Sequence, residues 1–475
     1  MGLTRALPTL PANLDQTMRA SLFLFLSLPL CFLACDGGND TSDTSDTDTD
    51  TDTDTADTDT GDAPFCETPT ACVDVGGACA LEGVQTEDLC LTKDKAWLLR
   101  GGVTIGDDVN PTTIKIEPGT TVYGESAQVS FLAIARHSKI IAEGTATAPI
   151  VFTSDQLDGQ RGRGDWGGLA INGLATINGC DGSDPCEAEA EGGVGKYGGD
   201  NDADNSGIVK YVRLEFGGVV ISTDNEINGF GLAGVGSGTM IDYVQIHAQN
   251  DDCIEFWGGT VSAKHIVCSL PGDDGIDWDF GWRGNMQHAL VIQDTVAGNN
   301  GIEADNHESA FASEPVSNPT LSNITLVGEP TIAASNYGTM LRRGTSGHLT
   351  NVAITGFSKA CLSIRDQQTY DNFATTSAID HTMMACAKPY EESADEMESM
   401  QEEDVFEAEL TNAIEDDLML TSVAVTGPDL RPKSGSPLLG AGQSPSGAWW
   451  DAATYVGAFD ATTDWTAGWT SFPSN

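Results

Sequence analysis

The chain has 475 residues, and its 71 Asp and Glu against 22 Lys and Arg give a formal net charge of −49. This charge repels phosphate, which excludes nucleic acid as a natural partner and excludes attachment to anionic lipid through basic residues. Because 40% of the residues are apolar, the chain can bury a large core, and wholesale disorder is excluded.

The N-terminus has the pattern of a secretion signal. Residues 21–34 form an apolar run that follows basic residues and is too short to span a bilayer comfortably. The run ends in Leu33-Ala34-Cys35, which resembles the lipobox of bacterial lipoproteins and implies cleavage before Cys35 and lipidation of its thiol. We therefore expect residues 1–34 to be a lipoprotein signal peptide, with Met1 or Met18 as the start. An ordinary signal peptide with an incidental cysteine is the alternative.

The next segment, residues 35–64, is expected to be a lipidated cysteine followed by a disordered tether. From Asp36 to Pro64 there are 11 Asp, mostly alternating with Thr, and no basic or large apolar residue. Such a stretch buries nothing and repels itself. A calcium loop is the alternative, but the Thr-Asp repeats lack the glycine turn and the hydrophobic anchor of such loops.

A second acidic segment, at about residues 391–418, interrupts the later part of the chain. It has 13 Asp or Glu between Glu391 and Asp417 and no basic residue. The spacing of its apolar residues predicts a helical insertion with one apolar face. These residues are Met397, Met400, Val405, Phe406, Leu410 and Ile414.

Cysteine usage indicates an oxidising compartment. Of the 12 cysteines, Cys31 leaves with the signal peptide and Cys35 takes lipid, so ten remain for five disulfides. A metal site is the alternative, although no C-x-x-C pair occurs. Proximity in the chain pairs Cys180 with Cys186, Cys253 with Cys268 and Cys361 with Cys386, and leaves two bridges among Cys66, Cys72, Cys79 and Cys90. Residues 65–100 are thus expected to form a small disulfide-tied cap.

Residues 101–475 are expected to form one all-β domain built from repeats. A strand of the form apolar-x-x-apolar-x-apolar recurs, starting at Val209, Ile241, Ala263, Met286, Leu321 and Leu349. A second strand recurs in phase with it, with Ile254, Ile276 and Ile302 in register. The starts at Ile241, Ala263 and Met286 are 22 and 23 residues apart, about one coil of a parallel β-helix.

Several ordered motifs resemble a family of bacterial envelope lipoproteins with a pectin-lyase-like fold. They occupy residues 144–154, 166–171, 197–200, 205–207, 225–229, 455–459 and 464–469. The resemblance covers most of residues 113–472 and implies a right-handed, single-stranded parallel β-helix. It implies little about activity, since the family is largely uncharacterised.

Alternation within the second strand predicts a column of carboxylates on the outside of the β-helix. Ile254, Ile276 and Ile302 would point inward and their neighbours outward. The outward carboxylates and those in the preceding turn, which we call the acidic ladder, are Asp252, Glu255, Asp274, Asp277, Asp279, Glu303 and Asp305. Like charges one coil apart, about 4.8 Å, repel by about 3–4 kcal/mol at an effective dielectric constant of 20, so something must offset this repulsion.

Three explanations compete for the acidic ladder. The first is bound Ca²⁺, because oxygen ligands without thiolate or imidazole suit a hard cation. The second is catalysis, with paired carboxylates as acid and nucleophile or with calcium and a basic residue. In the third, Asp and Asn cap turns by local hydrogen bonds, and Lys264, Arg283 or Arg342 neutralises the remaining charge.

The candidate catalytic residues are Asp251, Asp252, Asp274 and Arg283. Residues 250–254 resemble the paired-aspartate strand of polygalacturonase-type glycoside hydrolases, but the Gly-His-Gly and Arg-Ile-Lys motifs of that site are absent.

Two groups of tryptophans also occur. Trp257, Trp278 and Trp282 are candidates for stacking on sugar rings, with Trp278 expected in the core, and Trp449, Trp450, Trp465 and Trp469 are expected to cover the last coil.

Together these features predict a monomeric, lipid-anchored protein of the cell envelope, in the outer membrane. Its β-helix would serve as a binding or structural module for polysaccharide, with Ca²⁺ in the acidic ladder. A polysaccharide lyase or glycoside hydrolase acting in the β-helix groove is the first alternative, and a surface adhesin is the second.

Overall fold

The computed structural model describes residues 65–180, 182–222, 225–391 and 401–475. The signal peptide, Cys35 and the Thr/Asp-rich segment lie outside these residues. Within the described ranges, the helices are all too short or too polar to traverse a lipid bilayer.

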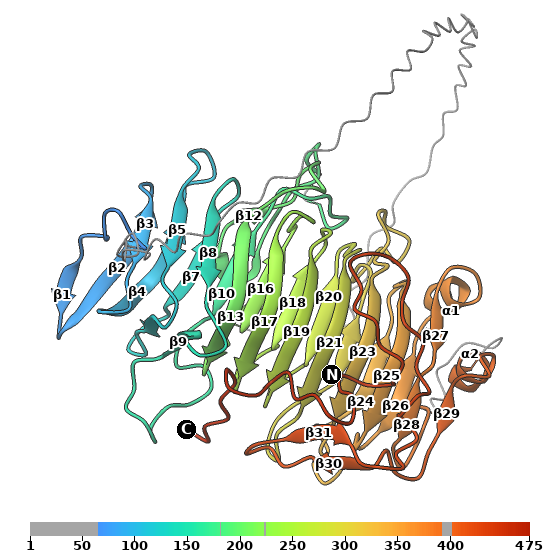
Figure 1. Ribbon diagram of the computed structural model, residues 1–475. Helices are drawn as coiled ribbons and strands as arrows, with labels where there is room; N and C mark the ends of the chain where they lie inside the picture. The colour runs from blue at the N-terminus through green and yellow to red at the C-terminus, as the bar shows by residue number, and fades with distance from the viewer. Residues whose placement is uncertain (1–64, 181, 223–224, 392–400) are drawn as a thin grey trace, which may run out of the picture. The chain divides into compact units, whose positions relative to one another are not determined.

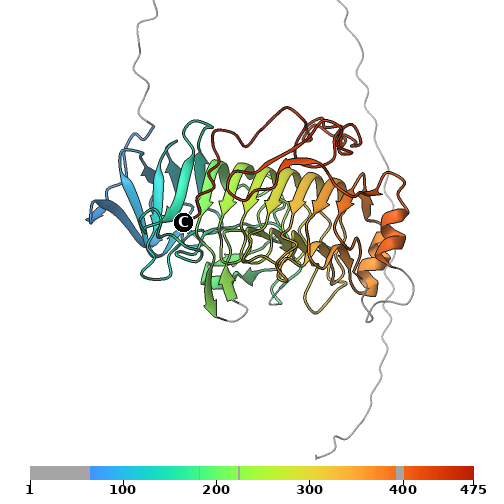
Figure 2. The same cartoon turned by 90° about the horizontal axis from the view of Figure 1, so that it is seen from below.

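These residues form a right-handed parallel β-helix, seen as a stack of parallel arrows (Figures 1 and 2). Strands from successive coils stack in three columns. Six long strands cross the first and second columns: β13 (Gly207–Glu215), β17 (Met240–His247), β19 (Ser262–Ser269), β21 (Asn285–Ile292), β23 (Thr320–Val327) and β25 (His348–Thr355). The first column also contains β3 (Leu89–Leu91), β5 (Thr113–Ile116), β8 (Lys139–Glu143) and β27 (Ala378–Asp380). The second also contains β6 (Thr121–Gly124), β9 (Ile150–Ser154), β28 (Met383–Ala385) and β29 (Ala413–Ile414).

The third column carries the second repeat found in the sequence. It consists of β7 (Phe131–Ile134), β10 (Leu169–Asn172), β16 (Phe230–Ala233), β18 (Ile254–Trp257), β20 (Ile276–Asp279), β22 (Ile302–Ala304), β24 (Tyr337–Leu341) and β26 (Ala360–Ile364). At its start, β2 (Ala78–Gln85) and β4 (Ala96–Ile105) cross from the second column into the third. The first repeat and the second are therefore different sides of the same coils.

Each of the six long strands bends at one residue with positive φ, and the pairing register skips that residue. These six residues, which we call the corner column, are Tyr211, Tyr243, His265, His288, Asn323 and Asn351. The bend explains the apolar-x-x-apolar spacing. Val209 and Val212 are three positions apart rather than two, yet both are fully buried, because the left-handed residue between them turns the backbone.

The five expected disulfides are present. They are Cys66–Cys90, Cys72–Cys79, Cys180–Cys186, Cys253–Cys268 and Cys361–Cys386. In the Cys-rich N-terminal segment, β1 (Val73–Val75) pairs antiparallel with β2, and β2 pairs parallel with β4. The strands of this segment thus continue the stack of the β-helix.

The acidic segment is helical over a shorter stretch than its apolar spacing predicts. Among its described residues only α2 (Glu402–Glu407) is helical; the other α-helix is α1 (Gln367–Phe373). Phe406 is buried in the core beside Tyr390, whereas Leu410 is 97% exposed, so the predicted continuous apolar face is wrong. Met397 and Met400 lie outside the described residues. Because α2 contacts β26 and β27, it covers the last coils.

The C-terminal tryptophans do not cover the last coil, and that prediction is wrong. Residues 433–475, which we call the C-terminal strap, run back along the side of the β-helix (Figures 1 and 2). Asn351 bonds Gln443, Asn323 bonds the Tyr455 carbonyl, and His247 lies 2.7 Å from the Pro473 carbonyl. The physical reason is that the outer face of the second column is apolar there and needs cover; its residues include Val267, Leu290 and Ala353.

Short antiparallel pairs complete the described fold. They are β11 (Ala188–Glu189) with β12 (Lys196–Tyr197), β14 (Val219–Ser222) with β15 (Asn225–Ile227), and β30 (Leu420–Ser422) with β31 (Asp429–Pro432). One 3-10 turn, η1, spans Glu191–Gly193.

The C-terminal strap is expected to stabilise the whole domain through Trp469. This side chain is 1% exposed and meets the rings of Tyr211 and Tyr243 edge-on. We expect Trp469→Ala to lower the free energy of unfolding by about 3 kcal/mol, because it leaves a large cavity. The matched variant Trp450→Ala, at a partly exposed position, should cost about 1 kcal/mol or less. Equal urea midpoints for the two variants would contradict this role.

Candidate functional site

The acidic ladder lies on the outer face of β18, β20 and β22, as the alternation predicts. Glu255 pairs in register with Asp277, and Asp277 with Glu303. The intervening Ile254, Phe256, Ile276, Trp278, Ile302 and Ala304 are fully buried in the core. The predicted inward and outward assignments are therefore confirmed.

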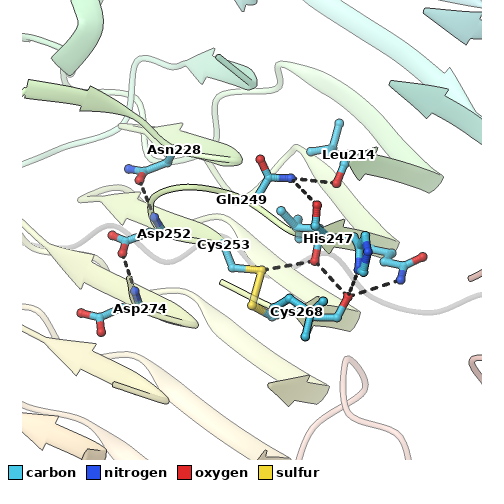
Figure 3. Close-up of a disulfide and its surroundings, with 12 residues drawn as sticks. Leu214, Asn228, His247, Gln249, Asp252, Cys253, Cys268 and Asp274 are labelled. Carbon is cyan, nitrogen blue, oxygen red and sulfur yellow. Dashed lines mark hydrogen bonds between the residues drawn. A yellow bond between two sulfur atoms is a disulfide. The ribbon is translucent and has the colours of Figure 1, made fainter. Parts of the chain in front are cut away.

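The turn before these strands holds a chain of hydrogen bonds between coils (Figure 3). The Asn228 side-chain oxygen accepts from the Asp252 amide at 3.2 Å, and Asp252 Oδ1 accepts from the Asp274 amide at 2.9 Å. Asp274 in turn accepts from the Asn300 amide. Aspartate and asparagine thus do cap turns here, but they cap the turn of the next coil rather than their own. One oxygen of Asp252 and one of Asp274 are satisfied in this way.

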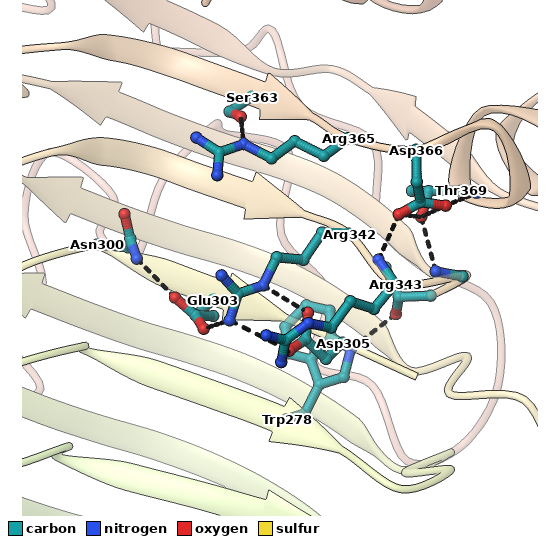
Figure 4. Close-up of polar contacts among 12 residues, drawn as sticks. Trp278, Asn300, Glu303, Asp305, Arg342, Arg343, Ser363, Arg365, Asp366 and Thr369 are labelled. Carbon is teal, nitrogen blue, oxygen red and sulfur yellow. Dashed lines mark hydrogen bonds and ion pairs between the residues drawn. The ribbon is translucent and has the colours of Figure 1, made fainter. Parts of the chain in front are cut away.

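Two arginines neutralise the C-terminal end of the acidic ladder (Figure 4). Arg342 Nε donates to Asp305 at 2.8 Å, and its Nη2 pairs with Glu303. Arg343 Nη1 lies 2.8 Å from the other oxygen of Asp305. The neutralising role predicted for Arg342 is confirmed, while that of Arg343 was missed.

The other two predicted neutralising residues lie elsewhere, and those predictions are wrong. Lys264 pairs with Asp451 of the C-terminal strap at 3.0 Å. Arg283 donates to Thr176 and pairs with Asp202 at 3.3 Å. Lys264 belongs to a long strand rather than to the third column, and Arg283 follows β20, so neither side chain reaches the acidic ladder.

The central part of the acidic ladder makes no ion pair with the described side chains, although the charge of Arg342 acts on Asp274 and Asp277 from a greater distance. Asp277 receives neither a hydrogen bond nor an ion pair from the described part of the chain, and Asp279 Oδ1 is buried without a partner. Three groups bring ligand oxygens within 4.8 Å of one another. They are Asp251, Asp252 and Asp273; Asp252, Glu255 and Asp277; and Asp274, Asp277 and Glu303.

The pKa values of these carboxylates reflect their burial and their close spacing. Burial, followed by repulsion from neighbouring carboxylates, holds the pKa values of Asp252, Glu255 and Asp277 well above their usual range. The pKa of Asp251 rises to about 7 for the same two reasons, and burial raises that of Asp305 to about 7 despite Arg343. At neutral pH Asp252, Glu255 and Asp277 therefore need protons or a cation to offset their charge.

The tryptophans near the acidic ladder are not available to sugars. Trp278 and Trp282 are fully buried, and Trp282 stacks on Phe256 with ring centroids 3.9 Å apart. Trp257 points outward but is covered by a small apolar cluster that includes Tyr197. The stacking role predicted for Trp257 and Trp282 is wrong, and the core position of Trp278 is confirmed.

The candidate catalytic residues are only partly brought together. Asp251 and Asp252 share a cluster with Asp273, and Asp274 lies one coil on from Asp252, whereas Arg283 is engaged by Thr176 and Asp202. Asp273 was not predicted, although it occupies the position of Asp251 in the next copy of the repeat. Asn228 was also missed as a member of the site, although its position in the earlier copy of the repeat matches that of Asp252.

The raised pKa values predict a specific pH dependence. Above pH 3.8, the ordinary pKa of Asp, the unfolded state loses protons that the folded state retains. The contribution of the acidic ladder to the free energy of unfolding should therefore fall as the pH rises towards 7. We expect Asp277→Asn in chelator to match the wild type near pH 4 and to be more stable by about 1 kcal/mol at pH 7. Urea unfolding at both pH values measures this difference. A variant that is less stable than the wild type at pH 7 would refute it.

Comparison with known proteins agrees with this architecture. A model of the pectate-lyase-like beta helix domain family matches residues 83–470. No curated protein and no solved structure matches the chain. Since the family match covers most of its length, the chain belongs to the pectate-lyase-like beta helix domain family.

Proposed function

We propose that this protein is a lipid-anchored lipoprotein of the cell envelope whose β-helix is a calcium-loaded binding module for polysaccharide. The observation that carries the proposal is the centre of the acidic ladder, which makes no ion pair in the described chain and where three carboxylates of neighbouring coils bring oxygens within 4.8 Å. The anchor rests on the lipobox resemblance at Cys35, and the outer membrane is the proposed location.

The chemistry of the donor set fits calcium. Ca²⁺ takes oxygen ligands at about 2.3–2.6 Å, so ligand oxygens of one site can lie up to about 5 Å apart. Asp252, Glu255 and Asp277 meet this condition, and so do Asp274, Asp277 and Glu303. Asp277 is common to both groups and has no protein donor in the described residues. Bound calcium would replace the protons that the buried carboxylates otherwise need.

Calcium binding predicts a stability effect that depends on Asp277. Adding Ca²⁺ to chelated protein at pH 7 should raise the melting temperature, because an ion that binds only the folded state stabilises it. Asp277→Asn should bind Ca²⁺ at least about tenfold more weakly, and Asp158→Asn, which changes an 89% exposed carboxylate, should bind like the wild type. Calorimetric titration measures the Ca²⁺ affinity of the wild type and of the two variants. Equal affinity in all three proteins would contradict binding in the acidic ladder.

Polysaccharide is the ligand class that this proposal favours, because partly buried calcium retains coordination positions for hydroxyl or carboxylate oxygens of a sugar. The test is binding to a panel of neutral and acidic glycans with and without Ca²⁺, with the products examined for new ends. Calcium-dependent binding without new ends supports a binding module. A surface adhesin predicts binding to cells instead of free glycan.

One observation favours a second candidate, a polysaccharide lyase. Burial and the neighbouring Arg343 lower the pKa of Arg342, which lies against Glu303 and Asp305 in the acidic ladder. A lyase needs calcium and a basic residue beside it, and Arg342 lies against the acidic ladder whereas Arg283 pairs with Asp202. Release of unsaturated sugar ends by the wild type but not by Arg342→Gln would establish this function. Release of reducing ends without unsaturation would indicate a hydrolase.

The proposed anchor predicts the behaviour of Cys35→Ser. The wild type should incorporate a fatty-acid label and sediment with membranes, because its acyl chains insert into the bilayer. The variant should lose the label. Cys31→Ser is the matched control, since its cysteine lies within the proposed signal peptide, and it should still be labelled. Label on Cys35→Ser equal to that of the wild type would refute the anchor.

A further inference from the structure

A second group of metal-ligand side chains lies where the C-terminal strap crosses the corner column. His265 and His288 are consecutive members of that column, and Asp451 belongs to the strap. One ligand atom of each residue lies within 4.8 Å of those of the other two. The imidazole rings stack with centroids 5.1 Å apart, and His288 Nε2 is 3.8 Å from Asp451 Oδ2. This group shares no residue with the acidic ladder.

The carboxylate of Asp242 orients the imidazole ring of His265. Its Nδ1 lies 2.8 Å from Asp242 Oδ1. Since an ionised carboxylate only accepts hydrogen bonds, this contact holds the proton on Nδ1 and leaves the lone pair on Nε2. A carboxylate behind an imidazole is the usual support of a metal-binding histidine, because it selects the tautomer and fixes the ring. Stacking on Tyr243, with centroids 4.0 Å apart, fixes the ring further.

His288 is 6% exposed, and apart from a contact with the backbone of Ala458 its ring makes no hydrogen bond in the described structure. Its Nδ1 is buried without a partner, and its Nε2 faces Asp451 beyond hydrogen-bond distance. An imidazole nitrogen that faces a carboxylate beyond hydrogen-bond distance is well placed to bind a metal ion between them.

We propose that His265, His288 and Asp451 bind a divalent transition-metal ion of the zinc type, which ties the C-terminal strap to the β-helix. Two imidazoles and one carboxylate are a ligand set that suits zinc and does not suit calcium. Lys264 occupies Asp451 Oδ1 at 3.0 Å and leaves Oδ2 facing His288.

Closing the site requires only a small movement. Ligand atoms of tetrahedral zinc are about 3.4 Å apart, given bonds of about 2.0–2.1 Å. The ligand atoms of this group lie within 4.8 Å of one another, and those of His288 and Asp451 are already 3.8 Å apart. The side chain of Asp451 is 51% exposed, so it can approach the two imidazole rings without disturbing the core.

The test uses full-length protein in buffer that contains calcium, so that the acidic ladder is occupied. Titration with Zn²⁺ should show one ion per chain and a rise in melting temperature, and Co²⁺ should give the visible absorption of a nitrogen and oxygen site. His265→Asn and His288→Asn should each weaken Zn²⁺ binding at least about tenfold. Asparagine is the replacement of choice because Asn323 and Asn351 occupy the corner column in the next two coils.

Two further variants make the result decisive. Asp451→Asn alters an exposed strap residue, so it should fold and still bind Zn²⁺ at least about tenfold more weakly. His137→Asn alters an exposed histidine that also has positive φ, and it should bind like the wild type. The proposal is overturned if the wild type binds no Zn²⁺ in calcium, or if His265→Asn, His288→Asn and Asp451→Asn retain wild-type affinity.

Discussion

Stacking at the coil spacing is the constraint on which the rest of this structure depends. Each side chain of a parallel β-helix lies about 4.8 Å from its counterparts in the coils before and after it. Inside, this spacing favours columns of like apolar residues, such as Ile254, Ile276 and Ile302, all fully buried. Outside, the same spacing makes a column of like charges costly, so every outward column needs hydrogen bonds, counter-charges, ions or a covering segment.

The columns of this protein meet that need in different ways. The turn column is satisfied by amide groups of the next coil, from Asn228 through Asp252 and Asp274. The C-terminal end of the acidic ladder is neutralised by Arg342 and Arg343. The apolar outer face of the second column is covered by the C-terminal strap. The centre of the acidic ladder makes no ion pair in the described chain, which is why we propose that calcium binds there.

The sequence predicted the repeat, the inward positions and the disulfides because these depend on residues close in the chain or related by one coil. The apolar-x-x-apolar pattern also indicates the bend in each long strand. Two inward residues that are three positions apart require a backbone that departs from the simple alternation of a strand. The partners of Lys264 and Arg283 could not be predicted in this way. Asp451 and Asp202 come from segments that fold back onto the coils, and nothing in the repeat specifies where such segments lie.

The covering role of the C-terminal tryptophans was missed for a related reason. A parallel β-helix has two open ends and several sides, and a tryptophan-rich C-terminal segment can cover an end or a side. The repeat itself held the deciding signal: the outward positions Val267, Leu290 and Ala353 are apolar, while Glu255, Asp277 and Glu303 on the other strand are charged. An apolar outer column requires a cover along the side, whereas at the last coils α2 packs Phe406 into the core.

The two proposed ion sites differ because the coils place different ligand types in different columns. The acidic ladder offers only carboxylate oxygens, held by a rigid sheet and partly buried, and a hard ion can satisfy several of them at once. The corner column changes along the chain from tyrosine through histidine to asparagine, and only its two histidines face a carboxylate of the C-terminal strap. Calcium would therefore stabilise the β-helix within itself, whereas a zinc-type ion would join the β-helix to its strap.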